Sequence, residues 1–268
     1  MKRKGTHTPT IEDVIEISGI EILHPGGYAL TKRTAELCEL KEGMHILDVS
    51  SGRGTQSIFY AQNYGVKVTG LDISEEMIKT ATSRAIDSRL SDRVKFVLGD
   101  SQNLPFSDNT FDVVINECAV GIPDDSQKVL DEMIRVVKPG GAVAIHESTW
   151  KKSLSAQEKE EISERYGTTP LEFQEWVGML KKAGATEITS EFDQWSKPEM
   201  FWNIRKDRKV KKFKAVMSHG EKTKTAFRVI RKYGISRVPK VFQNENYFYH
   251  VIMDGKLGYA LFKGVKSH

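Results

Sequence analysis

The sequence predicts an α/β fold in which seven strands form one doubly wound, mostly parallel sheet covered by helices. From Met44 onward, short apolar runs rich in β-branched residues alternate with longer segments of helical periodicity, the pattern of a parallel sheet with crossover helices. The 268 residues, 39% of them hydrophobic, suffice for one sizeable core and a small appended subdomain. The expected strands are residues 45–49, 67–72, 94–99, 111–116, 142–147, 186–191 and 257–263.

Helix signals divide the same region in a consistent way. Ser74 is placed to cap a helix that runs to about residue 89 and carries two glutamates in its first turn. Thr169 begins a capping box with proline at the first helical position, which predicts a helix over residues 171–183. Gly184 follows where that helix should end.

The segments around this core complete the predicted domain organisation. Residues 1–43 form an N-terminal helical segment, interrupted by His-Pro-Gly-Gly at 24–27. The core spans residues 44–191, and residues 256–268 contain its last strand. Residues 192–255 are too many for a bare loop, so we expect a small helical cap inserted before that strand. Its aromatic residues either line a ligand pocket or form the hydrophobic core of the cap itself.

Composition and charge exclude several classes of protein. No apolar run approaches the roughly 20 residues that cross a bilayer, so we expect a cytoplasmic protein without membrane insertion. The two cysteines and seven histidines lack the spacing of a disulfide framework or a metal site, so we expect no metal. Residues 205–240 hold 14 Lys and Arg against two acids. This basic block is either a solvated helical face or a contact for an anionic or macromolecular partner.

The first chemical motif is a glycine-bearing turn between a buried strand and a helix. It reads Ile-Leu-Asp-Val-Ser-Ser-Gly-Arg-Gly-Thr over residues 46–55. Gly52 and Gly54 let the backbone bend sharply and approach a ligand, and the helix that begins near Thr55 offers N–H groups to an anion. Taken alone, the motif also fits a dinucleotide site or a purely structural turn.

Two aspartates narrow this choice. Asp72 ends the second strand about 20 residues beyond the turn, where a carboxylate accepts hydrogen bonds from both ribose hydroxyls. Asp48 ends the first strand and would face the ammonium group of a cofactor with a methionine part, which a dinucleotide lacks. Either aspartate could instead be a surface strand end or a cap.

Three further motifs follow in order: Gly-Asp-Ser-Gln at 99–102, Leu-Pro-Phe with a later Phe-Asp at 104–112, and Lys-Pro-Gly-Gly at 138–141. With the first two, they make residues 44–148 resemble the class I S-adenosylmethionine-dependent methyltransferases, which have a Rossmann-like fold. The resemblance is greatest to the small-molecule branch that includes the ubiquinone/menaquinone biosynthesis methyltransferases. It implies a methyltransferase that uses S-adenosylmethionine, releases S-adenosylhomocysteine and needs no metal.

The resemblance also implies the residues that hold the cofactor. Asp72 matches the ribose-binding acid, Ile73 would lie against the adenine, and residues 100–102 match the segment beside the adenine amino group. One departure is Ser50-Ser51, where the family usually has glycine and then cysteine or another small residue; serine is small enough to keep the turn. The segment His24-Pro25-Gly26-Gly27-Tyr28 also resembles an N-terminal element that lies over the cofactor in some members; the alternative is a helix-breaking linker. The full set is Gly27, Asp48, Ser50, Gly52, Gly54, Thr55, Asp72, Ile73, Met77, Asp100, Ser101, Gln102 and Asn116.

Methyl transfer mainly requires that the acceptor be positioned and, where necessary, deprotonated. The candidate catalytic residues are Glu117 and His146 at the ends of central strands, with Glu147 beside them; His146 could instead be a satisfied strand-end histidine. We expect a small-molecule acceptor. The alternatives are a protein or RNA methylated through the basic block, or a non-catalytic cofactor-binding module. A nicotinamide-dependent oxidoreductase would leave the Asp100 motif without a role. The sequence does not identify the acceptor, the atom methylated or the oligomeric state.

Overall fold

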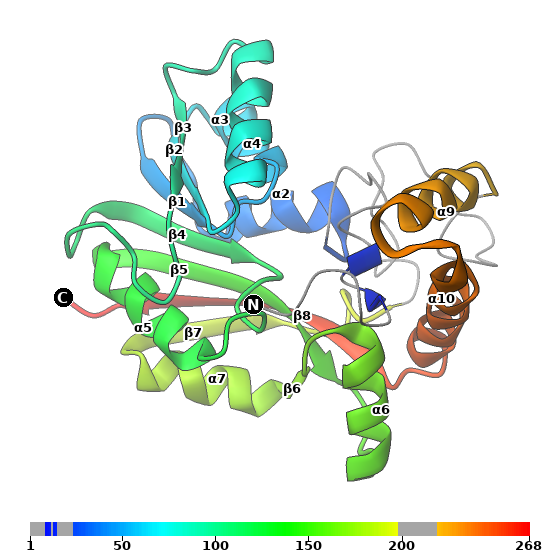
Figure 1. The fold of residues 1–268 in the computed structure, drawn as a ribbon. Coiled ribbons are helices and arrows are strands. Elements are labelled where there is room, and N and C mark those ends of the chain that lie inside the picture. The colour runs from blue at the N-terminus through cyan, green and yellow to red at the C-terminus, as the bar shows by residue number, and fades with distance from the viewer. Residues whose placement is uncertain (1–8, 12, 15–23, 198–218) are drawn as a thin grey trace.

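One sheet runs through the whole described structure (Figure 1). The computed structural model describes residues 9–11, 13–14, 24–197 and 219–268. The strands are β1 (His45–Val49), β2 (Lys67–Asp72), β3 (Val94–Leu98), β4 (Phe111–Glu117), β5 (Val137–Trp150), β6 (Leu171–Glu172), β7 (Ala185–Glu191) and β8 (Leu257–Lys266). Their order is β3-β2-β1-β4-β5-β8-β7, with β6 paired to β5. All pairs among β1 to β6 are parallel, and β8 is antiparallel to both neighbours, which confirms the predicted fold class.

The strand order reverses between β1 and β4, and this reversal positions the site. From β1 the chain first adds strands outward to β3, then returns to place β4 on the other side of β1. In such sheets, ligands bind beyond the carboxyl ends of the strands at the reversal point. The register sets Val49 beside Asn116 and Glu117 beside His146, so candidate residues from three strands meet at one edge.

Helices cover both faces of the sheet, because alternate residues of each strand point to opposite sides. They are α2 (Gly27–Leu37), α3 (Thr55–Tyr64), α4 (Glu75–Asp87), α5 (Ser126–Val136), α6 (Ala156–Tyr166), α7 (Phe173–Lys182), α9 (His219–Tyr233), the 3-10 helix η1 (Ile235–Arg237) and α10 (Val238–Met253). Ile46 faces the core under α2, α3 and α4, whereas Leu47 faces the core under α5 and α7. The sheet is therefore wound on both sides, as the sequence predicted.

A second core holds α10 against α6 and the far ends of β5 and β8. It includes Trp150, Tyr166, Phe248 and Tyr259. At its rim, the Arg165 guanidinium lies 4.2 Å from the centre of the Tyr247 ring. The described part of residues 192–255 is mainly helical, and residues 198–218 lie outside the described chain. The predicted domain boundaries stay predictions.

Two local predictions need correction. The helix expected over 171–183 begins at Phe173, because residues 171–172 form β6 and pair with Thr149 and Trp150. Glu172, not Thr169, is its N-cap and forms a capping box with Glu175. Thr149, the partner of Leu171 in β5, lies 22 residues away in the chain, so the local capping pattern did not reveal this pairing.

The fifth strand is longer than predicted. It begins at Val137 and ends at Trp150, because β8 pairs with it from Ala142 to its last residue. His146 and Glu147 therefore lie within β5 instead of after it. The cap of α4 is confirmed: the Ser74 hydroxyl accepts a hydrogen bond from the Met77 amide.

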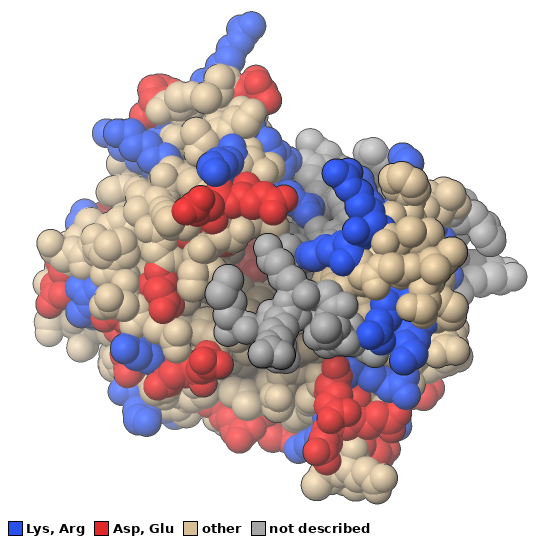
Figure 2. Space-filling model, viewed as in Figure 1, with Lys and Arg blue, Asp and Glu red and all other residues tan. Residues whose placement is uncertain are grey.

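In the N-terminal segment, α2 starts at Gly27, the last residue of the predicted break, and most of the residues before the break lie outside the described chain. Lys and Arg side chains gather beside α9 and α10, while Asp and Glu side chains gather over α6 (Figure 2). Within the described chain, no helix combines the length and the apolar character needed to cross a membrane.

Candidate active site

Two adjoining cavities lie at the carboxyl ends of the central strands. Their volumes are about 330 and 430 Å³, and they share Ser50, Asp72, Ala119 and Ile122 as lining residues. The first contains most of the turn after β1 together with Glu117; the second contains the segment after β3. The predicted cofactor residues that line them are Asp48, Ser50, Gly52, Thr55, Asp72, Ile73, Met77, Asp100, Ser101 and Gln102.

The turn after β1 keeps a left-handed backbone at three places. Ser50, Gly52 and Gly54 have φ values of 59°, 52° and 71°. A Cβ on Gly54 would lie 2.5 Å from the Phe96 ring, so packing and φ both require glycine there, and Gly54 lines neither cavity. Gly52 does line the first cavity, as predicted. Ser50 occupies a conformation that is costly for a residue with a side chain.

Asp72 organises the loop that separates the two cavities. Its Oδ2 accepts a hydrogen bond from the Gly52 amide and its Oδ1 accepts one from the Ser74 amide, each at 2.9 Å. The carboxylate thus fixes the turn after β1 to the start of α4 while it lines both cavities. The neighbouring Ile73 side chain is 74% exposed and lines the second cavity, where it offers a flat ring an apolar surface.

Asp48 is a buried carboxylate at the wall of the first cavity. Its side chain is 2% exposed, and its Oδ2 accepts a hydrogen bond of 2.5 Å from the Ser57 hydroxyl. Burial raises the pKa of Asp48 to about 8, against the opposing hydrogen bond from Ser57. A carboxyl in this state becomes ionised readily when a cation arrives beside it.

Two more predicted cofactor residues line neither cavity. Asn116 is fully buried, and its Oδ1 accepts a hydrogen bond from the Ala119 amide, which holds the turn after β4. Gly27 is buried at the start of α2, three residues after His24. From this segment it is the His24 side chain that reaches the first cavity.

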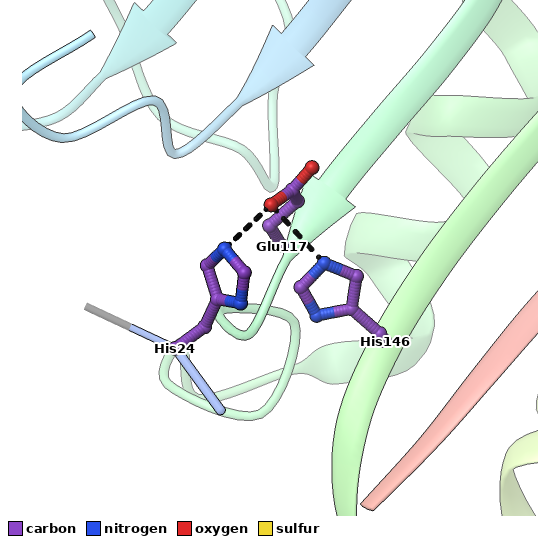
Figure 3. Close-up of side chains that lie close together, drawn as sticks. All are labelled: His24, Glu117 and His146. Atoms are coloured by element: carbon purple, nitrogen blue, oxygen red, sulfur yellow. Dashed lines mark ion pairs between the residues drawn. The ribbon is translucent and has the colours of Figure 1, made fainter. Parts of the chain in front are cut away.

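The side chains of His24, Glu117 and His146 point toward one another (Figure 3). Glu117 Oε2 lies 2.7 Å from His24 Nε2 and 3.2 Å from His146 Nε2. The three residues come from the segment before α2, the end of β4 and the middle of β5. All three side chains are at most 3% exposed, yet His24 and Glu117 line the first cavity.

Hydroxyl groups complete the surroundings of Glu117. Thr31 donates to its Oε2 at 2.9 Å, and Tyr60 donates to its Oε1. Although burial by itself raises the pKa of Glu117, the charges and hydrogen bonds of His146 and His24 outweigh it and hold the pKa below its usual range. Burial lowers the pKa of His146 to about 4, with Glu117 acting in the opposite direction. The carboxylate is therefore ionised inside the protein.

Glu147, the acidic residue of β5, stabilises the fold and does not line either cavity. Its Oε1 accepts a hydrogen bond of 2.7 Å from the Val120 amide. Burial raises its pKa to about 7, against several backbone N–H groups. Glu147 holds the loop that follows Glu117.

Sequence reasoning missed several lining residues. They are Asp13, His24, Ser51, Arg53, Gln56, Ser74, Cys118, Ala119, Ile122, Pro123, Asp124, and, at the base of the second cavity, Leu71 and Gly99. Most of them flank a motif that the sequence analysis did identify, so extending each motif by one or two residues would have found them. Asp13 comes from the N-terminal segment, and only the packing of that segment brings it to the site. His24 belongs to the 24–28 segment, from which the sequence analysis assigned only Gly27 to the cofactor.

Comparison with known proteins identifies the family. A family model described as a methyltransferase domain matches residues 40–198, more than half of the chain. The chain belongs to this family. This is the family that the five motifs predicted. The family's methyl transfer needs no metal.

Relatives within the family have several functions. Phosphoethanolamine N-methyltransferase 1 of Arabidopsis thaliana is 31% identical over 175 residues, which cover 65% of this chain and 35% of that protein. Demethylmenaquinone methyltransferase of Listeria monocytogenes is 35% identical over 133 residues, covering 47% of this chain and 56% of that protein. This methyltransferase-family chain thus matches only about a third to just over half of the length of these relatives.

A solved structure shows the same fold over nearly the whole chain. Phosphoethanolamine N-methyltransferase 2 of Haemonchus contortus, in complex with phosphomonomethylethanolamine and S-adenosylhomocysteine, superimposes with a TM-score of 0.73. The match covers 96% of this chain and 57% of that protein, at 22% identity. At this identity the likeness establishes the fold alone.

Proposed function

We propose that the chain transfers a methyl group from S-adenosylmethionine to a small-molecule acceptor. The observation that carries the proposal is the continuous lining of the two cavities by Asp48, Asp72 and residues 100–102, with Glu117 beside them. These are the family's motif residues, and they meet at the strand-order reversal where ligands of this fold class bind.

The residues present fit this cofactor. Asp48 is a buried carboxyl with a raised pKa and has the Ser57 hydroxyl as a hydrogen-bond partner, so an ammonium group beside it would be stabilised. Asp72 retains acceptor capacity for ribose hydroxyls beyond its two amide partners. Ile73 offers an apolar surface for adenine, and the backbone and side chains of 100–102 lie on the same cavity wall. When bound, the cofactor supplies an activated methyl group on a positively charged sulfur.

Glu117 is the residue best placed to act on the acceptor. It is ionised, lines the cavity that also contains Asp48, and is oriented by four polar neighbours. Such a carboxylate binds a cationic acceptor group, whereas its lowered pKa makes it a weak proton acceptor. His146 does not line the cavity and lies 3.2 Å from Glu117 Oε2, so we assign it a positioning role.

The acceptor class follows from the size of the cavity and from the relatives. The cavity of about 330 Å³ that contains Glu117 also contains the residues assigned to the cofactor, so only its Glu117 end would remain for an acceptor, which must be small. The names of the relatives include phosphoethanolamine and demethylmenaquinone as substrates. A small polar or partly apolar metabolite suits both observations. The cytoplasmic location expected from the sequence stays a prediction.

A protein or RNA acceptor is a second candidate. It is favoured by the Lys and Arg side chains that gather beside α9 and α10 (Figure 2). Incubation with methyl-labelled cofactor and separated cell fractions distinguishes the candidates. Label in the metabolite fraction supports the first proposal, label in protein or RNA supports the second, and label in neither contradicts both and favours a non-catalytic module.

The cofactor is tested directly by calorimetry. We expect S-adenosylmethionine and S-adenosylhomocysteine to bind with micromolar affinity, and NAD not to bind. Preference for NAD, or no binding of either sulfur compound, would contradict the proposal.

A further inference from the structure

We propose that His24, Glu117 and His146 form a binding site for one divalent transition-metal ion, with Nε2, Oε2 and Nε2 as ligand atoms. Within the described chain, these are the three side chains with metal-competent atoms that all lie within 4.8 Å of one another. Two imidazoles and one carboxylate suit Zn²⁺, Fe²⁺, Mn²⁺ or Co²⁺. This site goes beyond methyl transfer, which needs no metal in the family, and does not depend on the proposed function.

The hydrogen-bond pattern determines which ring nitrogen is protonated in each histidine. His24 Nδ1 lies 2.7 Å from the Pro25 carbonyl oxygen, which only accepts, so Nδ1 carries a hydrogen. The Tyr259 hydroxyl donates to the His146 carbonyl oxygen at 3.1 Å, so it accepts from His146 Nδ1 at 2.8 Å. Both neutral rings would then present an Nε2 lone pair to the same carboxylate oxygen.

Such an arrangement needs a positive charge at its centre. A proton on His24 Nε2 satisfies the 2.7 Å contact with Glu117. It leaves His146 Nε2 fully buried and 3.2 Å from Oε2, without a hydrogen-bond partner in the part of the chain that the structure describes. A metal ion would engage all three atoms at once. Ligand atoms bound at roughly 2.1 Å lie about 3.0–3.4 Å apart. The His146 Nε2–Glu117 Oε2 distance of 3.2 Å lies in that range, and the 2.7 Å between His24 Nε2 and Oε2 would lengthen slightly on binding.

The outer contacts are those expected around metal ligands. A metal-bound histidine usually donates its second N–H to a carbonyl or another polar group, and both rings do so here. Tyr60 donates to Glu117 Oε1, which turns Oε2 toward the two histidines. His24 and Glu117 also line the first cavity, so an ion would have an entry path and free positions facing any bound acceptor.

The test measures metal binding independently of turnover. Protein freed of metal by a chelator is titrated with Zn²⁺ by calorimetry and with Co²⁺ by visible absorption, which reports nitrogen and oxygen ligands. The decisive variant is His24→Gln, which keeps a donor toward Glu117 but removes the imidazole ligand. His45→Gln is the matched control, because His45 is a part-buried histidine on β1 that hydrogen-bonds Thr69.

We expect one ion per chain in the parent protein and in His45→Gln, and at least about 100-fold weaker binding in His24→Gln. Unchanged binding in His24→Gln, or no stoichiometric binding of either metal to the parent protein, would overturn the site and leave a protonated His24 paired with Glu117. S-adenosylmethionine titrations of the same proteins keep the two proposals separate. If the cofactor binds and metal does not, only the metal site fails; if metal binds and the cofactor does not, only the proposed function fails.

Discussion

The two halves of the site are built in different ways. The half around Asp48 and Asp72 comes from short turns that follow consecutive strands, and its residues lie within recognisable motifs. The half around Glu117 needs the segment before α2, the end of β4 and the middle of β5 to meet. The first half depends largely on motifs of a few neighbouring residues each, whereas the second half depends on contacts between distant segments. We therefore expect changes in the first half to affect cofactor binding and changes in the second to affect turnover.

The largest effect is expected for Asp72→Ala. The carboxylate holds the Gly52 and Ser74 amides, and each hydrogen bond to a charged group contributes about 1.5–3 kcal/mol. Affinity for S-adenosylmethionine should fall by roughly 100-fold or more, measured by calorimetry. Asp92→Ala, an exposed acid beside Arg93, serves as the control and should bind normally. Equal affinity in the two variants would mean that Asp72 does not hold the cofactor.

Glu117→Gln should separate the two halves. Because the amide keeps the shape but loses the charge, methyl transfer into an extracted metabolite pool should fall by roughly 100-fold, in line with the loss of a charged contact worth about 1.5–3 kcal/mol. Affinity for S-adenosylmethionine should change less than about threefold, since the first half is intact. Glu164→Gln on the exposed side of α6 is the control. A comparable loss of cofactor affinity in Glu117→Gln would show that the halves are one unit.

The raised pKa of Asp48 makes cofactor binding by the half around Asp48 and Asp72 depend on pH. Below about pH 8 the free carboxyl is protonated, and binding of an ammonium group requires its ionised form, so binding should release a proton. Affinity should rise about tenfold per pH unit from pH 6 and pass a maximum near pH 8, where the ligand's own amino group loses its charge. Calorimetry in buffers of different ionisation enthalpy measures the released proton. Asp48→Asn should bind weakly with no rise over this range; an unchanged rise would assign it to another group.

The smallest effect is expected at Ser50. Its φ of 59° costs a residue with a side chain about 1 kcal/mol that glycine avoids. Ser50→Gly should raise the free energy of unfolding in urea by about that amount and leave cofactor affinity within about twofold. Ser50→Ala keeps the Cβ and should give no gain. A gain in both variants would attribute the effect to the hydroxyl instead of the backbone.

Local patterns in the sequence predict much of this fold and of the cofactor half. The turn at residues 46–55 and the cap at Ser74 depend on neighbours within a few residues, so their residue types carry the information. The start of α7 depends on β6, whose partner strand is distant in the chain. The capping pattern at Thr169 therefore predicted the wrong start for this helix. His24 has no motif partner nearby, so only the packed structure could bring it to Glu117.

The place of β8 in the sheet also bears on how the chain folds during synthesis. Among the described strands, β7 joins the sheet only through β8, and β8 lies against β5 along nine residue pairs. Until residues 257–266 emerge from the ribosome, β5 offers an unpaired apolar edge and β7 has no strand to join. Such an edge is a template for contact with other nascent chains. The second core contains Leu257 and Tyr259 and therefore cannot be completed before this strand is synthesised. Final assembly of the β5 side of the molecule should therefore be a late event, and before it a chaperone would shield the exposed edge of β5.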